Sequence, residues 1–259
     1  MDDKLFVPYL KELADKYSAA SDIQVDLKEG EICLQCDKGS YSFFYDLAKY
    51  EASAGKTAVP LLHWRNKRKY IELKNILKTK MIEDVRGMRI HHIVPKDEFN
   101  SSLMNILAYE SDLVEIITGE KIDKIFADFS SDVYTNCIVS AAKLKISMEL
   151  GFSPEGSEPV LLHEVIARTG IASDVVVDTQ MQQYPIYVIK GRKVDHYNEI
   201  DNELYGLDNT QADCIRFILG VLANPDAIPA LQEQGNHLVS VYRAAEEATK
   251  VLEYVEVRC

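Results

Sequence analysis

The chain has 259 residues, 47% of them hydrophobic and 27% charged, so it is long enough to bury one large core or two small ones. Lys and Arg total 29 against 41 Asp and Glu, and the net charge of −12 disfavours nucleic acid and anionic membranes as partners. No stretch approaches the roughly 18 apolar residues of a membrane span, and the five cysteines form no disulfide framework. We therefore expect a cytoplasmic protein without nucleic-acid or membrane partners.

The first part of the chain predicts short elements of mixed type. Apolar residues at helical spacing predict a helix over residues 3–18, and two short strands follow, Ile23–Leu27 and Ile32–Gln35. A lysine turn, Asp37-Lys38-Gly39, comes next. The pattern beyond it predicts a helix, a buried strand and a second helix, at Tyr41–Ser53, Thr57–His63 and Lys69–Lys80.

The character of the sequence changes near Glu83. A long strand is expected at Val85–Val94, and a helix closed by Gly119 at Asn100–Thr118. Strand patterns with few helices between them follow, and they indicate an antiparallel or mixed sheet: Ile122–Phe129, Val133–Ala141, Leu144–Leu150, Val160–Ala167, Val175–Thr179 and Gln182–Lys190. Two helices, Asn209–Leu222 and His237–Glu253, finish the chain.

This order of elements resembles the Gfo/Idh/MocA family of NAD(P)-dependent oxidoreductases from about Leu34 to Glu253. The turn Asp37-Lys38-Gly39 takes the place of the family's Glu-Lys-Pro turn, and the strand after it ends near Arg65. The helix that carries Asn105, Tyr109 and Asp112 resembles the family's helix with an Asp-x-x-x-His pair. The resemblance implies an α+β protein: a partial, truncated Rossmann-like remnant at residues 1–82, then a family-type C-terminal domain with a large open sheet at residues 83–259.

Two departures from the family concern the cofactor and the chemistry. The Rossmann fingerprint needs glycines two residues apart, so that the backbone approaches a pyrophosphate, and none of the 12 glycines here are so placed. Asn105 stands at the position of the family's Asp, and Tyr109 at that of its His. Asn105 cannot act as a carboxylate, and a phenol is a poor general base near neutrality unless a cation such as Lys38 acts on it.

The resemblance makes Lys38, Tyr109 and Asn105 the candidate catalytic residues, and His63, Arg65 and Asp112 the candidate substrate-binding residues. Three of the six have a structural alternative: Lys38 as a solvated turn lysine, Tyr109 as a packing residue and His63 as a hydrogen-bonded core histidine. His91 and His92 are consecutive on a strand and face opposite sides. No His or carboxylate set has metal spacing, so no metal is expected.

These observations favour a degenerate oxidoreductase-family protein that is non-catalytic alone or dependent on a partner. It would bind a small polar metabolite or a full-length paralogue, and no cofactor by itself. The alternative is an active NAD(P)-dependent reductase that uses Lys38 and Tyr109, with the nucleotide held unconventionally or by another subunit, so whether the chain is an enzyme stays open. The exposed face of an open sheet predicts a homo-oligomer, or a hetero-oligomer with the paralogue.

Overall fold

The computed structural model describes residues 3–53, 57–97, 99–174, 186–190, 193–197 and 207–258. The contacts between residues divide the chain into two compact units. Unit 1 holds the described residues up to Lys67 and the described part of Asp201–Val239. Unit 2 holds the described parts of Arg68–Ile200 and Ser240–Cys259. Each unit is described below by itself.

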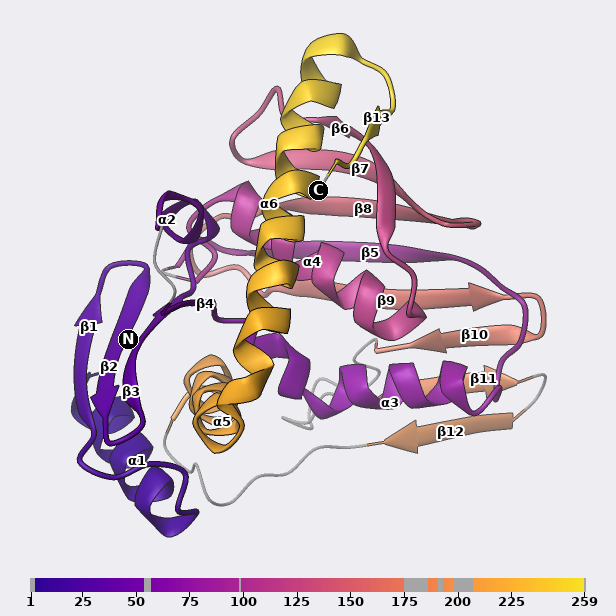
Figure 1. Ribbon diagram of the computed structural model, residues 1–259. Helices are drawn as coiled ribbons and strands as arrows, with labels where there is room; N and C mark the ends of the chain where they lie inside the picture. The colour runs from indigo at the N-terminus through magenta and orange to yellow at the C-terminus, as the bar shows by residue number, and fades with distance from the viewer. Residues whose placement is uncertain are drawn as a thin grey trace. The chain divides into compact units, whose positions relative to one another are not determined.

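Unit 1 is built on a four-stranded sheet in the order β1-β2-β3-β4 (Figure 1). The first three strands form antiparallel hairpins, and only β3 and β4 run parallel, joined through α2 (Leu47–Ala52). The strands are β1 (Gln24–Lys28), β2 (Glu31–Cys36), β3 (Gly39–Phe44) and β4 (Ala58–Pro60). The unit also contains α1 (Asp3–Lys16), η1 (His63–Asn66), α5 (Asn209–Ala223), η2 (Pro225–Ala227) and the first half of α6 (Ile228–Val251).

The helix predicted at Tyr41–Ser53 is wrong, because strand β3 occupies its first part. Phe44, Leu47 and Tyr50 have helical spacing, but that spacing spans a junction at which a strand ends and α2 begins. Asp46 marks the junction, since its side chain accepts hydrogen bonds from the backbone N–H groups of the first turn of α2. The lysine turn therefore joins two antiparallel strands rather than a strand and a helix. The strand predicted at Thr57–His63 is shorter, Ala58–Pro60.

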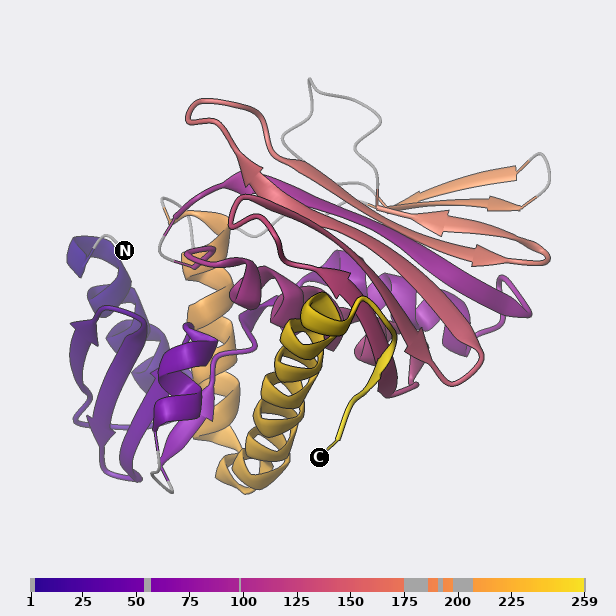
Figure 2. The same ribbon diagram turned by 90° about the horizontal axis from the view of Figure 1, so that it is seen from above.

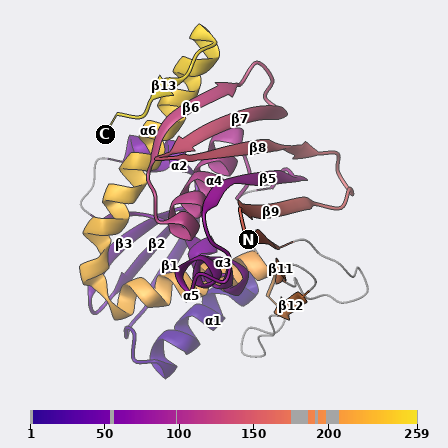
Figure 3. The same ribbon diagram turned by 90° about the vertical axis from the view of Figure 1, so that its right-hand side faces the viewer.

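Unit 2 is built on a nine-stranded mixed sheet in the order β12-β11-β10-β9-β5-β8-β7-β6-β13. Strand β5 lies between β8, to which it is parallel, and β9, to which it is antiparallel (Figure 3). All other pairs are antiparallel. The bounds are β5 (Val85–Pro95), β6 (Ile122–Asp128), β7 (Tyr134–Ala141), β8 (Leu144–Ser153), β9 (Val160–Ala167), β10 (Gly170–Ser173), β11 (Ile186–Lys190), β12 (Lys193–Tyr197) and β13 (Val255–Glu256).

The helices of unit 2 lie on one face of this sheet (Figure 2): α3 (Arg68–Lys78), α4 (Leu103–Thr118) and the second half of α6. Helix α4 is buried on almost every side, and its ends are well defined. The Ser102 hydroxyl accepts from the Asn105 N–H at its start, and Gly119 adopts a left-handed conformation (φ 77°) at its end. The side chains of the sheet that face the helices are mostly apolar and form the core: Met88, Ile90, Val139, Ile146, Met148, Leu150 and Val165.

The α+β class, the mixed sheet and the closure of the long helix by Gly119 are confirmed. The truncated Rossmann-like remnant and the domains 1–82 and 83–259 stay predictions, and the predicted strand Val175–Thr179 lies outside the described residues. In the described part of the chain, no single helix is long and apolar enough to cross a bilayer. One bent pair, Asn209–Ala223 with Pro225–Val251, meets that test by length and composition only when taken together.

Two helical glycines of unit 1 provide a matched test of packing. A Cβ on Gly235 would lie 2.6 Å from the Tyr50 ring and 2.9 Å from Pro60, whereas a Cβ on Gly220 would meet nothing within 4 Å. We expect Gly235→Ala to lower the free energy of unfolding by about 1–3 kcal/mol through overpacking. Gly220→Ala should raise it by up to about 1 kcal/mol, because alanine favours the helix. Urea unfolding followed by circular dichroism measures both, and equal effects would contradict this packing.

Candidate functional site

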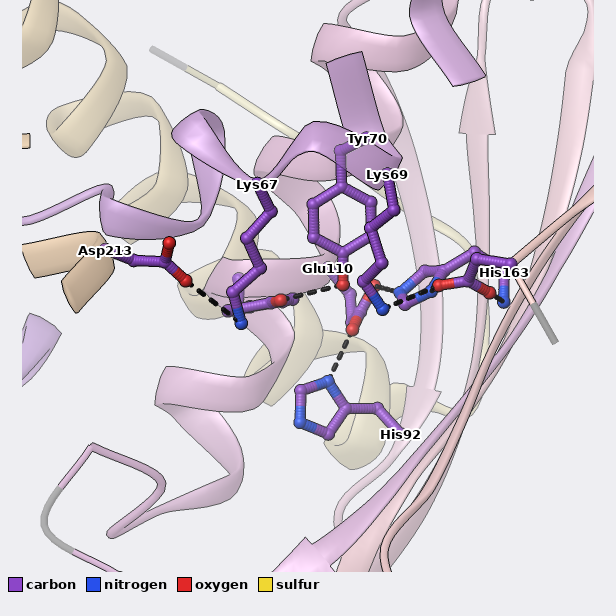
Figure 4. A network of polar contacts seen from close by, with 9 residues as sticks. Lys67, Lys69, Tyr70, His92, Glu110, His163 and Asp213 are labelled. Carbon is purple, nitrogen blue, oxygen red and sulfur yellow. Dashed lines mark hydrogen bonds and ion pairs between the residues drawn. The ribbon is translucent and has the colours of Figure 1, made fainter. Parts of the chain in front are cut away.

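The inner face of the sheet in unit 2 carries a buried cluster of polar side chains (Figure 4). Strands β5 and β9 supply His92 and His163 at positions that face α4, and α4 supplies Glu110. The other members come from the first turn of α3, from α4 and from the residue after β10: Lys69, Tyr70, Tyr109 and Asp174. Every one of these seven side chains is buried.

His163 lies at the centre of the cluster, between two carboxylates. Its Nδ1 is 2.6 Å from Asp174 Oδ2, and its Nε2 is 3.0 Å from Glu110 Oε2. An ionised carboxylate can only accept hydrogen bonds, so the ring donates from both nitrogens and is an imidazolium. The backbone N–H of His163 also donates to Asp174 Oδ1, at 2.5 Å.

Two further contacts complete the charged part of the cluster. The Lys69 ammonium donates to Asp174 Oδ2 at 2.8 Å and lies 4.6 Å from the centre of the Tyr70 ring. His92 Nδ1 donates to the second oxygen of Glu110. The cations Lys69 and His163 thus balance the carboxylates Glu110 and Asp174, which is how buried charges are tolerated.

The pKa values of the central groups follow from this geometry. Burial by itself would lower the pKa of His163, but the charges of Asp174 and Glu110 raise it to about 9. Burial by itself would raise the pKa of Glu110, but the charge of His163 and its hydrogen bond lower it to about 2. The pKa of Asp174 lies below its ordinary value, since His163 and then Lys69 outweigh its burial. All three groups are therefore charged at neutral pH.

Two tyrosines lie against the charged groups. The Tyr70 and Tyr109 hydroxyls are 2.8 Å apart, and the Tyr70 ring packs edge-on against His163 with centroids 5.0 Å apart. Burial, followed by the nearby Tyr109, Asp174 and Glu110, raises the pKa of Tyr70 well above 10. Tyr70 therefore stays a neutral phenol near pH 7. Its hydroxyl can donate a hydrogen bond to Tyr109 or accept one from it.

Three of the predicted site residues lie together on α4. Asn105, Tyr109 and Asp112 are spaced four and three residues apart, so they share one stripe of the helix. All three are buried. Asn105 Nδ2 donates to the Ser101 hydroxyl at 3.0 Å, and Tyr109 also packs edge-on against His92, with centroids 5.1 Å apart.

The other three predicted site residues lie in unit 1. Lys38 Nζ donates to the carbonyl of Leu222, at 2.9 Å, in the last turn of α5. His63 and Arg65 lie on η1, where His63 Nδ1 is 3.2 Å from the carbonyl of Leu61. Burial, and then the charge of Lys67, lower the pKa of His63 to about 3, so that this ring is neutral. Lys67 itself lies 3.7 Å from Asp213 (Figure 4).

Unit 1 contains a parallel strand–helix–strand arrangement, β3-α2-β4, where a nucleotide phosphate would be sought. Its turn has no glycine between Phe44 and Leu47, and Asp46 caps the helix. Asp46 Oδ1 accepts from the N–H groups of Ala48 and Lys49, at 2.9 and 3.2 Å. A carboxylate therefore already uses the donors that a pyrophosphate would need, and it would repel one.

Sequence patterns alone did not single out Lys69, Tyr70, Glu110, Asp174 or His163, and of His92 they predicted only that it lies on the opposite face of a strand from His91. Strand alternation could have shown that His92 is buried, because it shares a face of the strand with Met88, Ile90 and Val94. A histidine among inward-facing apolar residues indicates a buried partner for it. In the described part of the chain, no three His, Cys, Asp or Glu side chains are placed to hold a metal ion.

Comparisons with known proteins establish the fold. No protein-family model matches the chain, and no curated protein matches it. An oxidoreductase domain protein from Kribbella flavida is 12% identical with a TM-score of 0.62, over 83% of this chain and 73% of its own.

Two further solved structures each match 82% of this chain and 70% of their own. An Agrobacterium radiobacter oxidoreductase, in complex with NAD+, L-tartaric acid and magnesium, is 12% identical with a TM-score of 0.61. The Lactobacillus casei scyllo-inositol dehydrogenase, with NAD(H) and scyllo-inositol, is 15% identical with a TM-score of 0.57. The chain therefore has the fold of Gfo/Idh/MocA-type oxidoreductases.

The imidazolium at the centre of the cluster predicts a pH dependence of stability. Because the pKa of His163 is about 9 in the folded protein and 6.5 ordinarily, its contribution is complete below pH 6.5 and is lost as the pH rises through 9. The loss amounts to roughly 3 kcal/mol. Glu110 acts at the other end, since its contribution is complete above pH 4.5 and is lost as the pH falls through about 2. Urea unfolding between pH 5 and 10 measures the alkaline slope.

His163→Gln should lower the free energy of unfolding near pH 6 by about 3–5 kcal/mol, since the cluster loses a cation. It should also flatten the alkaline slope. The control is His91→Gln, on the opposite face of the sheet, where His91 Nδ1 pairs with half-exposed Glu149 at 3.2 Å. This variant should keep the slope, and an unchanged slope in His163→Gln would contradict the imidazolium.

The contact of Lys38 with α5 predicts a structural role for the lysine turn. A cation on the last carbonyls of a helix is favourable, so Lys38→Met should lower the free energy of unfolding by about 0.5–1 kcal/mol. Lys38→Arg, which keeps the charge, should lose less than half of that. Thermal unfolding of the three proteins side by side is the measurement, and a Met variant as stable as the wild type would exclude this role.

Proposed function

We propose that this chain is a degenerate oxidoreductase-fold protein that performs no redox reaction by itself and acts by binding. Its ligand would be a small polar metabolite or a full-length paralogue. The observation that carries the proposal is the Asp46 cap of α2, because this carboxylate uses the backbone donors of the parallel strand–helix turn in unit 1. NAD(P) does not fit that turn, and no step is assigned to a cofactor.

The buried cluster in unit 2 supports the same proposal. A catalytic acid or base must exchange its proton with a substrate, so it needs a hydrogen-bonding position that the substrate can take. Here both nitrogens of His163 and both oxygens of Asp174 are used within the protein. Their opposite charges hold the protons in place. The cluster is thus suited to fix α4 against the sheet rather than to transfer protons.

The open sheet of unit 2 is the surface on which we expect a partner. Five large apolar side chains are exposed on the face that the helices of the unit leave uncovered (Figure 2): Tyr134, Ile138, Val160, Ile166 and Ile171. Exposed apolar patches of this kind mark interaction sites in folded proteins. This face of the sheet is the outer face referred to below.

The alternative function is reduction by a Lys38–Tyr109 pair. It requires the Lys38 ammonium and the Tyr109 hydroxyl to break the hydrogen bonds that they make in this structure. The Lys38 ammonium is bonded to the Leu222 carbonyl, and the Tyr109 hydroxyl to that of Tyr70. The alternative would also need a nucleotide from another subunit, or one bound outside the β3-α2-β4 turn. Nucleotide binding that depends on another subunit and on Lys38 and Tyr109 would support this alternative.

Titration of the purified protein with NADH and NADPH tests the proposal. We expect no nucleotide fluorescence change and no heat in calorimetry up to millimolar concentrations. The scyllo-inositol dehydrogenase from Lactobacillus casei, whose solved structure holds NAD(H), is titrated identically as the positive control. Tight binding of either nucleotide by the chain alone would contradict the proposal. Binding that appears only after a full-length paralogue is added, and that Lys38→Ala and Tyr109→Phe abolish, would favour the alternative.

A further inference from the structure

Unit 2 contains a cleft of about 390 Å³ at the end of the sheet where α3 leads into β5, on the right-hand side of Figure 1. Its walls come from the last turn of α3, the first residue of β5, the end of α4 and the turn between β7 and β8. The volume lies in the range of small-molecule sites, about 300–1,000 Å³. The cleft shares no residue with the buried cluster or with the exposed apolar side chains of the outer face.

The cleft has an apolar floor and a charged rim. Leu144 is buried, and Leu77 and Val85 are half-buried, so aliphatic side chains form the floor. Glu120 and Lys143 line the same cleft and are exposed. Apolar walls with a few polar groups are typical of sites for small molecules. A ligand would therefore bury an aliphatic body and keep its charged groups at the rim.

The two charged rim groups make no hydrogen bond or ion pair with the described residues. This holds for the Glu120 carboxylate and for the Lys143 ammonium. Lys121, which follows Glu120 in the chain, does have a partner, since its ammonium lies 2.9 Å from the Glu115 carboxylate. Two opposite charges on one rim, both without a described partner, suit a ligand that carries one charge of each sign.

The end of α4 adds hydrogen-bond acceptors on the side of Glu120. The Thr118 hydroxyl donates to the Val114 carbonyl at 2.6 Å and accepts from the Glu120 N–H at 3.2 Å. Its only hydrogen is thus used, and it can offer a ligand an acceptor alone. The last carbonyls of a helix also carry a partial negative charge. This side of the cleft therefore favours an ammonium group, and Lys143 favours a carboxylate.

The turn that carries Lys143 has an unusual backbone. Ala142 adopts a φ of 52°, in the left-handed region that alanine rarely occupies. Glycine or asparagine is favoured at such a position in a two-residue hairpin turn. Strained backbone conformations gather at ligand sites, where the surrounding structure maintains them. The turn thus supports a role for Lys143 beyond the joining of two strands.

We infer that the cleft binds a free aliphatic α-amino acid, such as leucine. This molecule carries its ammonium and carboxylate on one carbon and an aliphatic side chain beyond it, which matches a rim with both charges above an apolar floor. Glu120 and Thr118 accept from the ammonium, and Lys143 donates to the carboxylate. The inference rests on the proposed function, a chain that acts by binding, and gives the small polar metabolite a site and a chemical class.

Calorimetric titration of the purified chain with leucine and three related molecules tests the inference. 4-Methylpentanoate lacks the ammonium, 3-methylbutylamine lacks the carboxylate, and glycine lacks the side chain. We expect saturable binding of leucine with a dissociation constant of about 1 mM or below, and roughly tenfold weaker binding of each related molecule. Equal binding of leucine and any one of the three would overturn the inference. So would the absence of saturable binding by leucine, isoleucine and valine.

Two variants without a rim charge test the role of each group. Glu120→Gln should weaken leucine binding roughly tenfold but should not weaken that of 4-methylpentanoate, which has no ammonium. Lys143→Gln should weaken leucine binding similarly but should not weaken that of 3-methylbutylamine. Asp123→Asn and Lys74→Gln are the matched controls, because both residues are exposed and lie outside the cleft. These two variants should bind leucine as the wild type does.

Rim variants that bind leucine as tightly as the two controls would overturn the inference. Circular dichroism checks that every variant is folded, and Glu120→Ala or Lys143→Ala replaces a glutamine variant that is not. The absence of leucine binding would leave the proposed function intact, because that proposal is carried by the Asp46 cap of α2. NADH binding by the same sample would overturn the proposed function, whatever the result with leucine.

Discussion

The charged histidine between Glu110 and Asp174 is the interaction on which unit 2 depends. Its two carboxylate partners come from a helix and from the end of a strand, and Lys69 adds a second helix. Each pair is buried, so removing any one member leaves a charge without compensation in a low-dielectric interior. Because the four charges sum to zero, the cluster holds α3 and α4 against the inner face of the sheet where an apolar core would otherwise be expected.

The two faces of the large sheet use polar groups in different ways. On the inner face, the side chains of the cluster pair with one another across the sheet and the helices, and all of them are buried. On the outer face, pairs such as Arg89 with Glu164 join neighbouring strands and leave apolar groups exposed between them. The first arrangement stabilises the fold, and the second leaves a surface with exposed apolar side chains that the described helices do not cover. The outer face is for this reason the partner surface that we propose.

Sequence patterns predicted the long elements of unit 2 well and the short ones of unit 1 poorly. Strand β5 and helix α4 have many residues to establish their period, and the ends of α4 carry recognisable caps. Between Tyr41 and Ser53, by contrast, a strand and a helix follow each other within a dozen residues. The apolar residues across that junction have the spacing of one helix. Only the hydrogen bonds of β3 with β2 and β4 show that the first part is a strand.

The sequence by itself determined the acidic charge, the absence of closely spaced glycines and the type of most elements, because composition and period are local properties. It also placed Asn105, Tyr109 and Asp112 on one helix. Only the tertiary structure decided which charges meet. Glu110 and His163 are 53 residues apart in the chain, and Lys69 and Asp174 are 105 apart. No local pattern encodes such pairs, since the sheet register and the helix packing bring them together. The same holds for Lys38, whose partner on α5 lies 184 residues away.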